Sequence, residues 1–60
     1  MKFNINKVKE FIKEDNESII IRNHADIYIK LDKIFKKVYI LQDFGWECWE
    51  KESYDSYFMN

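Results

Sequence analysis

The fold is decided by Ile27-Tyr28-Ile29-Lys30-Leu31-Asp32, in which large aliphatic residues alternate with amphipathic and charged ones. A period of two places one set on each face of a β-strand. Residues 18–23 are rich in isoleucine and also predict a strand, and residues 35–42 predict a third. In the third, Val38 and Ile40 share one face, and Tyr39 and Leu41 share the other. Successive strands of this kind predict an antiparallel meander.

Turn-forming residues separate these strands. Asn23-His24-Ala25-Asp26 carries them at both ends, and Asp32-Lys33 can form a tight turn. Gln42-Asp43-Phe44-Gly45 fits a type I turn with glycine in the left-handed position. That hairpin would return residues 46–51 as a fourth strand.

The C-terminal segment also fits a helix. Trp46, Trp49, Ser53 and Tyr57 fall on one helical face. Its β-prone aromatic residues favour a strand. Both alternatives stay open on the sequence.

Residues 4–15 predict an N-terminal helix. Four apolar residues recur there at helical spacing: Ile5, Val8, Phe11 and Ile12. Asn4 is a suitable N-cap, Phe3 and Val8 occupy the positions of a hydrophobic staple, and Asn16 can close the helix. We therefore expect one α+β domain over residues 1–60. In it the helix packs on an antiparallel meander of three to four strands, followed by a C-terminal strand or short helix.

A chain of 60 residues gains little stability from burial in its own core. A domain of this size buries only about 60% of the surface that its unfolded form exposes. Cys48 is the only cysteine, so no disulfide can add stability within the chain. Hydrophobic residues make up 47% of the sequence and aromatic residues 18%. We expect a homodimer, in which edge-strand pairing or face-to-face packing supplies further burial.

The sequence also indicates a compartment. A lone cysteine and an N-terminus without the apolar core of a signal peptide predict a reducing cytoplasm, that of a host cell. The longest apolar run, Ile19-Ile20-Ile21, is far too short to span a membrane. We expect no membrane partner.

The candidate catalytic residues lack the neighbouring base and orienting groups that catalysis needs. Cys48 is flanked by apolar and acidic residues, and the only histidine, His24, lies in a predicted turn. His24 with Asp26 is more typical of a surface pair than of a base and its orienting group. The sequence contains no phosphate-binding glycine loop and no zinc-ligand spacing. We expect neither enzymatic activity nor a cofactor or metal site.

A lysine-rich hairpin suggests an alternative function. Lys30, Lys33, Lys36 and Lys37 are interleaved with Tyr28, Phe35 and Tyr39. Basic residues among aromatic ones can bind single-stranded nucleic acid by stacking and phosphate contact. The formal net charge of −1 argues against it, because such affinity comes from neutralised phosphates.

Charge is divided along the chain. Residues 1–42 hold nine basic and six acidic side chains, a net of +3, and residues 43–60 hold one basic and five acidic, a net of −4. Tryptophan and tyrosine are the residues that most often anchor interfaces. The partner-binding residues that we predict are Trp46, Glu47, Trp49, Glu50, Glu52, Tyr54, Asp55 and Tyr57. They predict a host or defence protein with a basic surface as the partner. The same aromatic residues could instead complete the core or lie inside a dimer.

The order of the expected elements resembles one family of type II anti-CRISPR proteins. The corresponding pieces are Asn4-Ile5-Asn6 through Lys13, the strands around Ile20, Ile29 and Ile40, and Gly45-Trp46 onward to Tyr57-Phe58. The resemblance spans most of the chain but includes no specific motif. It implies a small phage-encoded inhibitor of a bacterial defence protein that acts by protein contact. Because this sequence is shorter and much less acidic, no residue role is carried over. An antitoxin or immunity-type protein is a further alternative.

Overall fold

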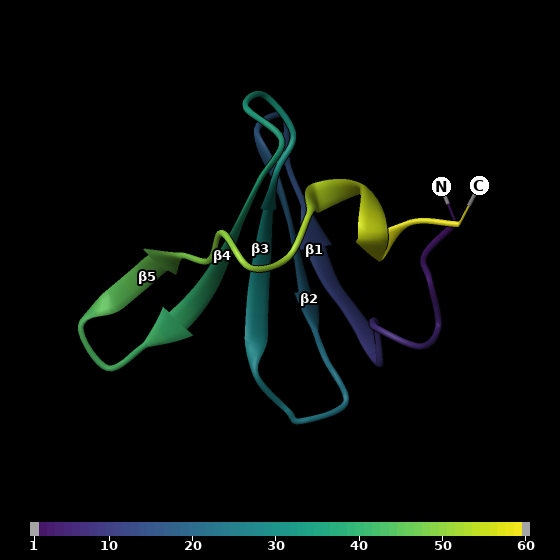
Figure 1. The fold of residues 1–60 in the computed structure, drawn as a ribbon, viewed down its shortest axis with the longest axis horizontal. Coiled ribbons are helices and arrows are strands. Elements are labelled where there is room, and N and C mark those ends of the chain that lie inside the picture. Colours follow the sequence, from purple (N-terminus) through teal and green to yellow (C-terminus); the bar gives the residue numbers. More distant parts are fainter. Residues whose placement is uncertain (1, 60) are drawn as a thin grey trace.

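The computed structural model describes residues 2–59 and contains one antiparallel sheet (Figure 1). Its strands, in spatial and chain order, are β1 (Glu10–Glu14), β2 (Ser18–Arg22), β3 (Tyr28–Asp32), β4 (Lys37–Gln42) and β5 (Gly45–Cys48). One 3-10 turn follows, η1 (Tyr54–Tyr57). The architecture is therefore an all-β meander of five strands.

The strands predicted from the period of two are confirmed. The register pairs Ile21 with Ile29 and Ile29 with Ile40, so the large aliphatic residues gather on one side, which we call the core face. Gly45 has φ +122°, which agrees with the positive φ predicted for the glycine of the last hairpin. The C-terminal segment contains both a strand, which ends at Cys48, and a short 3-10 turn.

The predicted N-terminal helix is wrong, and with it the α+β fold class. Asn4 starts a single turn, in which its side-chain Oδ1 accepts the Asn6 amide at 3.0 Å and its carbonyl accepts the Val8 amide at 2.9 Å. The chain then extends into β1. An isolated helix of about twelve residues is marginal in water. A strand at this position instead pairs with β2, which would otherwise be an unpaired edge.

Three turns of the meander begin with an Asp or Asn side chain that accepts hydrogen bonds from the backbone amides that follow it. The carboxylate of Asp15 accepts the amides of Glu17 and Ser18, each at 2.8 Å. Asn23 and Asp32 accept amides of the residues that follow them in the same way, at 2.9 to 3.2 Å. Such Asx turns offer the backbone local partners where the ladder ends.

The core lies between the core face and the two ends of the chain. Its buried residues are Val8, Ile19, Ile21, Ile29, Leu31, Val38 and Tyr57. Of the predicted helix stripe only Val8 is buried, and the side chain of Ile5 is 74% exposed. The face is covered instead by the N-terminal turn and by residues 49–58, which we call the covering segment.

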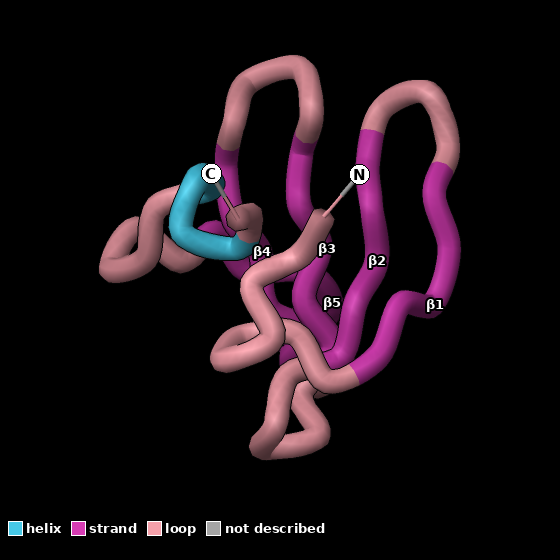
Figure 2. Tube along the Cα trace, turned by 90° about the vertical axis from the view of Figure 1, so that its right-hand side faces the viewer, coloured by secondary structure: helices cyan, strands magenta, loops and turns pink. Residues whose placement is uncertain are grey.

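The covering segment crosses the sheet from β5 towards β1 and ends beside the N-terminus (Figure 1). Figure 2 shows η1 and the N-terminal residues on the same side of the sheet. Phe3 and Phe58 form an isolated bridge with stacked rings, and the Asn4 amide donates to the Tyr57 carbonyl at 2.9 Å. The two ends of the chain therefore hold each other over the core.

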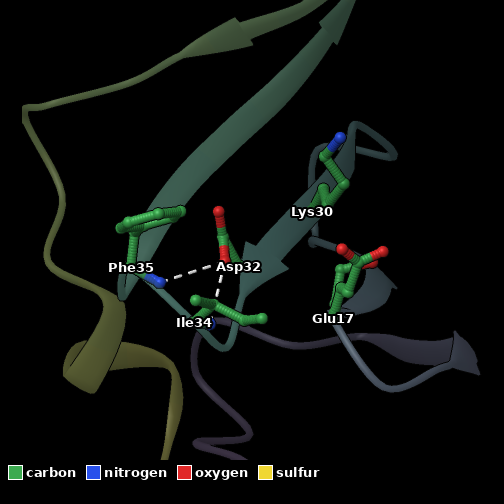
Figure 3. A pocket seen from close by; sticks show the side chains of 6 residues that line it. Glu17, Lys30, Asp32, Ile34 and Phe35 are labelled. Atoms are coloured by element: carbon green, nitrogen blue, oxygen red, sulfur yellow. Dashed lines mark hydrogen bonds between the residues drawn. The ribbon is translucent and has the colours of Figure 1, made fainter.

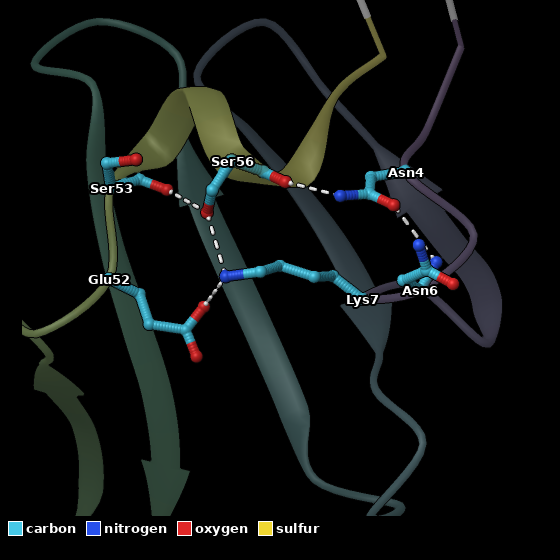
Figure 4. A network of polar contacts seen from close by, with 6 residues as sticks. All are labelled: Asn4, Asn6, Lys7, Glu52, Ser53 and Ser56. Atoms are coloured by element: carbon cyan, nitrogen blue, oxygen red, sulfur yellow. Dashed lines mark hydrogen bonds and ion pairs between the residues drawn. The ribbon is translucent and has the colours of Figure 1, made fainter.

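A polar network strengthens this junction (Figure 4). The Lys7 ammonium contacts Glu52 Oε2 at 2.7 Å and Ser56 Oγ at 3.2 Å. The Ser56 hydroxyl donates to the Ser53 carbonyl at 2.7 Å, and the Asn4 amide side chain donates to the Ser56 carbonyl at 3.1 Å.

Within residues 2–59, no helix is long and apolar enough to cross a membrane.

Candidate functional site

The side of the sheet opposite the core face has no covering element within the described residues, and we call it the open face. The register places Lys13, Ile20, Lys30 and Tyr39 in one row across β1 to β4. One step along the strands lie the pairs Arg22–Tyr28 and Leu41–Trp46. Aromatic, aliphatic and basic side chains are therefore mixed on this face.

A groove about 290 Å³ in volume runs along the open face. It is lined by Ile12, Lys13, Ile20, Tyr28, Leu41 and Trp46. Four of these side chains keep a substantial exposed fraction: Ile12 39%, Tyr28 39%, Leu41 43% and Trp46 36%. Large apolar side chains grouped on one surface are typical of a binding site.

Lys30 is the basic residue at the centre of the open face. Its ammonium lies 5.0 Å from the ring centroid of Trp46 and 5.2 Å from that of Tyr39, within cation–π distance. Four other basic residues are in ion pairs: Lys7, Lys9, Arg22 and Lys33. Among the described residues, neither Lys13 nor Lys30 contacts a carboxylate within ion-pair distance. The uncompensated positive charge at the centre of the open face therefore comes from these two lysines, and Lys37, which the alternation of β4 places on the same face opposite Asp32, adds to it at the end of the strand.

A second groove, about 450 Å³ in volume, lies between the covering segment and the β3–β4 turn with the adjoining ends of β4 and β5, and we call it the C-terminal groove. It brings together five of the predicted partner-binding residues: Trp49, Glu50, Glu52, Tyr54 and Asp55. Trp49 and Tyr54 pack against the core, so their rings are held in place. Two lysines, Lys36 and Lys37, also line the groove, and the Lys36 ammonium lies 5.0 Å from the Tyr54 ring centroid. The remaining lining residues are Phe35, Val38, Cys48 and Ser53.

The other three predicted residues lie elsewhere. Trp46 is on the open face, and Glu47 pairs with Ile40 and accepts a hydrogen bond from Gln42 at 3.1 Å. Tyr57 is 1% exposed and belongs to the core. Burial, followed by the neighbouring Glu52 carboxylate, raises the pKa of Tyr57 well above its usual value. A partner cannot reach this ring unless the covering segment moves.

The lysine hairpin does not form one cluster. Lys33 pairs with Glu14 at 2.7 Å, and Lys36 turns to Tyr54 from a backbone with φ +57°. A recess of about 220 Å³ lies beside this hairpin (Figure 3). In it the Asp32 carboxylate faces the amides of Ile34 and Phe35, at 2.9 and 3.2 Å, and so shapes the turn.

His24 and Asp26 make separate contacts. His24 Nε2 lies 2.7 Å from the Ile5 carbonyl, whereas the Asp26 carboxylate accepts a hydrogen bond from Lys9 at 2.8 Å. That bond and the charge of Lys9 lower the pKa of Asp26. The exposed thiol of Cys48 lies at the far edge of the sheet. Within residues 2–59, no three His, Cys, Asp or Glu side chains converge as metal ligands would.

The open-face groove contains four residues that the sequence did not mark as functional: Ile12, Lys13, Ile20 and Leu41. Ile20 lies between two core residues of a run that reads as uniformly apolar. The alternation within β2 places its side chain on the opposite face and could have identified it. For Ile12 and Lys13, the predicted helix obscured the pairing with β2.

Comparison with known proteins gives no relative: no family model, no curated protein and no solved structure matches this chain.

Proposed function

We propose that this chain is a non-enzymatic binding protein that inhibits a partner protein by contact through the C-terminal groove. The observation that carries the proposal is the convergence there of Trp49, Glu50, Glu52, Tyr54 and Asp55. These residues lie within positions 49–55 of the covering segment, and the segment's path over the core sets them against residues 35–38 of the β3–β4 turn and β4.

The groove is lined by lysines as well as carboxylates, and its exposed carboxylates indicate the chemistry of the partner. Glu50 and Asp55 are exposed, and neither has an ion-pair partner among the described residues, whereas Glu52 is paired with Lys7. Exposed carboxylates steer a protein towards a basic surface. Trp49 and Tyr54 supply aromatic area that is already ordered, so binding loses little side-chain entropy there.

The form of function that we propose is inhibition of a host or defence protein in the cytoplasm of a host cell. The resemblance to anti-CRISPR proteins depended on an element order that begins with a helix, whereas the first element among residues 2–59 is the strand β1. The proposal therefore depends on the groove and not on that resemblance.

Charge reversal in the groove tests the proposal. The tagged protein and its Glu50→Lys/Asp55→Lys variant would each be incubated with bacterial lysate, and the captured proteins identified by mass spectrometry. We expect a basic protein captured by the parent and lost by the variant. The matched control is Glu17→Lys/Asp43→Lys, which makes the same change in net charge at exposed residues outside the groove. Equal capture by both folded variants would refute the proposal.

A further inference from the structure

We propose that the open face binds single-stranded nucleic acid, a ligand that the C-terminal groove would not take. The bases would stack on Tyr28, Tyr39 and Trp46, and the phosphates would contact Lys13 and Lys30. This site lies on the opposite side of the sheet from the covering segment, so it does not depend on the proposed protein contact.

The first observation is the arrangement of the rings. Tyr28 and Trp46 line one groove with the aliphatic side chains of Ile20 and Leu41 between and beside them. Strands β3, β4 and β5 fix the backbone under each ring. Every nucleobase has an aromatic face, so rings held on a sheet can accept successive bases without regard to sequence.

The second observation is the placement of charge. Lys13 and Lys30 occupy the same row, with β2 between their strands, so their Cα atoms lie about 10 Å apart. Neither has a carboxylate partner among the described residues, and Lys30 already lies over two of the rings. A single-stranded nucleic acid that lies across the sheet from β1 towards β5 would contact both ammonium groups and then the rings of Tyr39 and Trp46.

The net charge of −1 does not exclude this ligand, because few carboxylates are free near the groove. Glu10 is paired with Arg22, and Asp26 with Lys9. Asp32 turns its carboxylate to two backbone amides at the far end of β3. Glu17 is the exception, because it is exposed, has no ion-pair partner among the described residues and lines the same recess as Lys30 (Figure 3). Glu50, Glu52 and Asp55 lie on the covering segment, across the sheet.

The same charges disfavour a second copy on this face. Two-fold, face-to-face packing would set the central Lys30 of one copy near Lys30 of the other and remove both from water. An unpaired buried charge is costly. A polyanion instead satisfies these lysines. Duplex DNA hides its bases from side-chain rings, so we expect a preference for single strands.

Fluorescence anisotropy with a labelled oligothymidine of about twelve nucleotides tests the proposal, since single-strand sites span roughly 4 to 16. We expect a dissociation constant on the order of 10⁻⁴ M or tighter at low salt. Two phosphate contacts predict a slope of about −1.4 for log affinity against log salt, or about a sevenfold loss between 50 and 200 mM.

The variants separate stacking from charge. Trp46→Ala should weaken binding at least about fivefold, whereas Phe44→Ala, which removes the exposed ring at the tip of the β4–β5 hairpin, should not change it. Trp46→Phe should restore most of the affinity. Lys13→Gln and Lys30→Gln should each reduce the salt slope by about 0.7, and Lys51→Gln, on the covering segment, should leave it unchanged. Tyr28→Leu provides a second ring deletion if Trp46→Ala does not fold.

Several results would overturn the inference. One is the absence of binding at low salt with millimolar protein, and another is equal affinity for duplex and single strand. A third is a dimer in light scattering that Trp46→Ala dissociates, because a second copy would then occupy the face. A fourth is capture of an acidic protein that Lys30→Gln releases while oligothymidine does not compete. Glu50→Lys/Asp55→Lys should not weaken oligothymidine binding, so this test and that of the C-terminal groove can fail separately.

Discussion

The Lys7–Glu52 ion pair should couple the two ends of the chain measurably. The Lys7 ammonium is 2.7 Å from Glu52 Oε2, and the two side chains are only 34% and 25% exposed. Lys7 also contacts Ser56 and lies 5.3 Å from the Tyr57 ring centroid. The perturbations are Lys7→Met, Glu52→Gln and the two together.

The expected magnitudes follow from these contacts. Exposed ion pairs contribute about 0.2–1 kcal/mol, and hydrogen bonds to charged groups about 1.5–3 kcal/mol. Half-buried and doubly bonded, this pair should have a coupling energy of about 1 kcal/mol, with single-variant losses of about 1 to 2 kcal/mol. In a domain of about 60 residues, 1 kcal/mol lowers Tm by about 4–8 °C.

The assay is thermal and urea unfolding followed by circular dichroism, analysed as a double-mutant cycle. The control cycle uses Lys9 and Asp26, which are 2.8 Å apart but 45% and 62% exposed. We expect a coupling energy below about 0.5 kcal/mol there. If the Lys7–Glu52 coupling were no larger than that of the control, the ion pair would not hold the covering segment, and the reasoning would be wrong.

Three further predictions concern acid, alkali and backbone strain. The amides of Glu17 and Ser18 lower the pKa of Asp15. The stability that these hydrogen bonds provide is therefore present above about pH 4 and is lost as the pH falls through the lowered pKa. Asp15→Asn should flatten the acid side of the Tm–pH curve, and an unchanged curve would contradict this. Burial raises the pKa of Tyr57, so its contribution is complete below about pH 10 and is lost as the pH rises towards the raised value. Tyr57→Phe should therefore reduce alkaline unfolding, measured by tyrosinate absorbance, and an equally steep alkaline transition would count against it. A Cβ at Gly45 would meet no atom within 4 Å, so the cost of Gly45→Ala comes from the backbone φ of +122° alone. The variant should lose about 1–3 kcal/mol of unfolding free energy, seen as a lower urea midpoint. An unchanged midpoint would show that the turn adjusts without cost.

The strands could be predicted from the sequence because burial acts on alternate residues. Ile29 and Leu31 are fully buried while Tyr28 and Lys30 face the other way, and this is the pattern that an antiparallel strand with one buried face must have. The turns were also readable, since Asn23 and Asp32 can satisfy backbone amides locally.

The helix was predicted because a bulge imitates a helical period. The register shifts between Phe11 and Lys13, so Phe11 pairs with Ile21 on the core side, whereas Ile12 lines the open-face groove. Val8, in the preceding turn, is buried as well. Three apolar residues at spacings of three and one therefore look like one helical stripe although they serve two faces of a sheet. Only the pairing partner, β2, distinguishes these arrangements, and a local pattern does not contain it.

The sites depend even more on long-range placement. The sequence divides charge between residues 1–42 and 43–60, which predicts one acidic, aromatic end. In the fold, β5 keeps Trp46 on the open face beside Lys30, while the chain beyond it crosses to the core face with Glu50 and Asp55. The division of charge along the chain thus becomes a difference in charge between the two sides of the sheet. Because the sheet separates Lys30 from Glu50, one ligand of uniform charge cannot satisfy both sides. A partner that requires both must carry opposite charges on two separate surfaces, and charge reversal on one side should leave binding to the other intact.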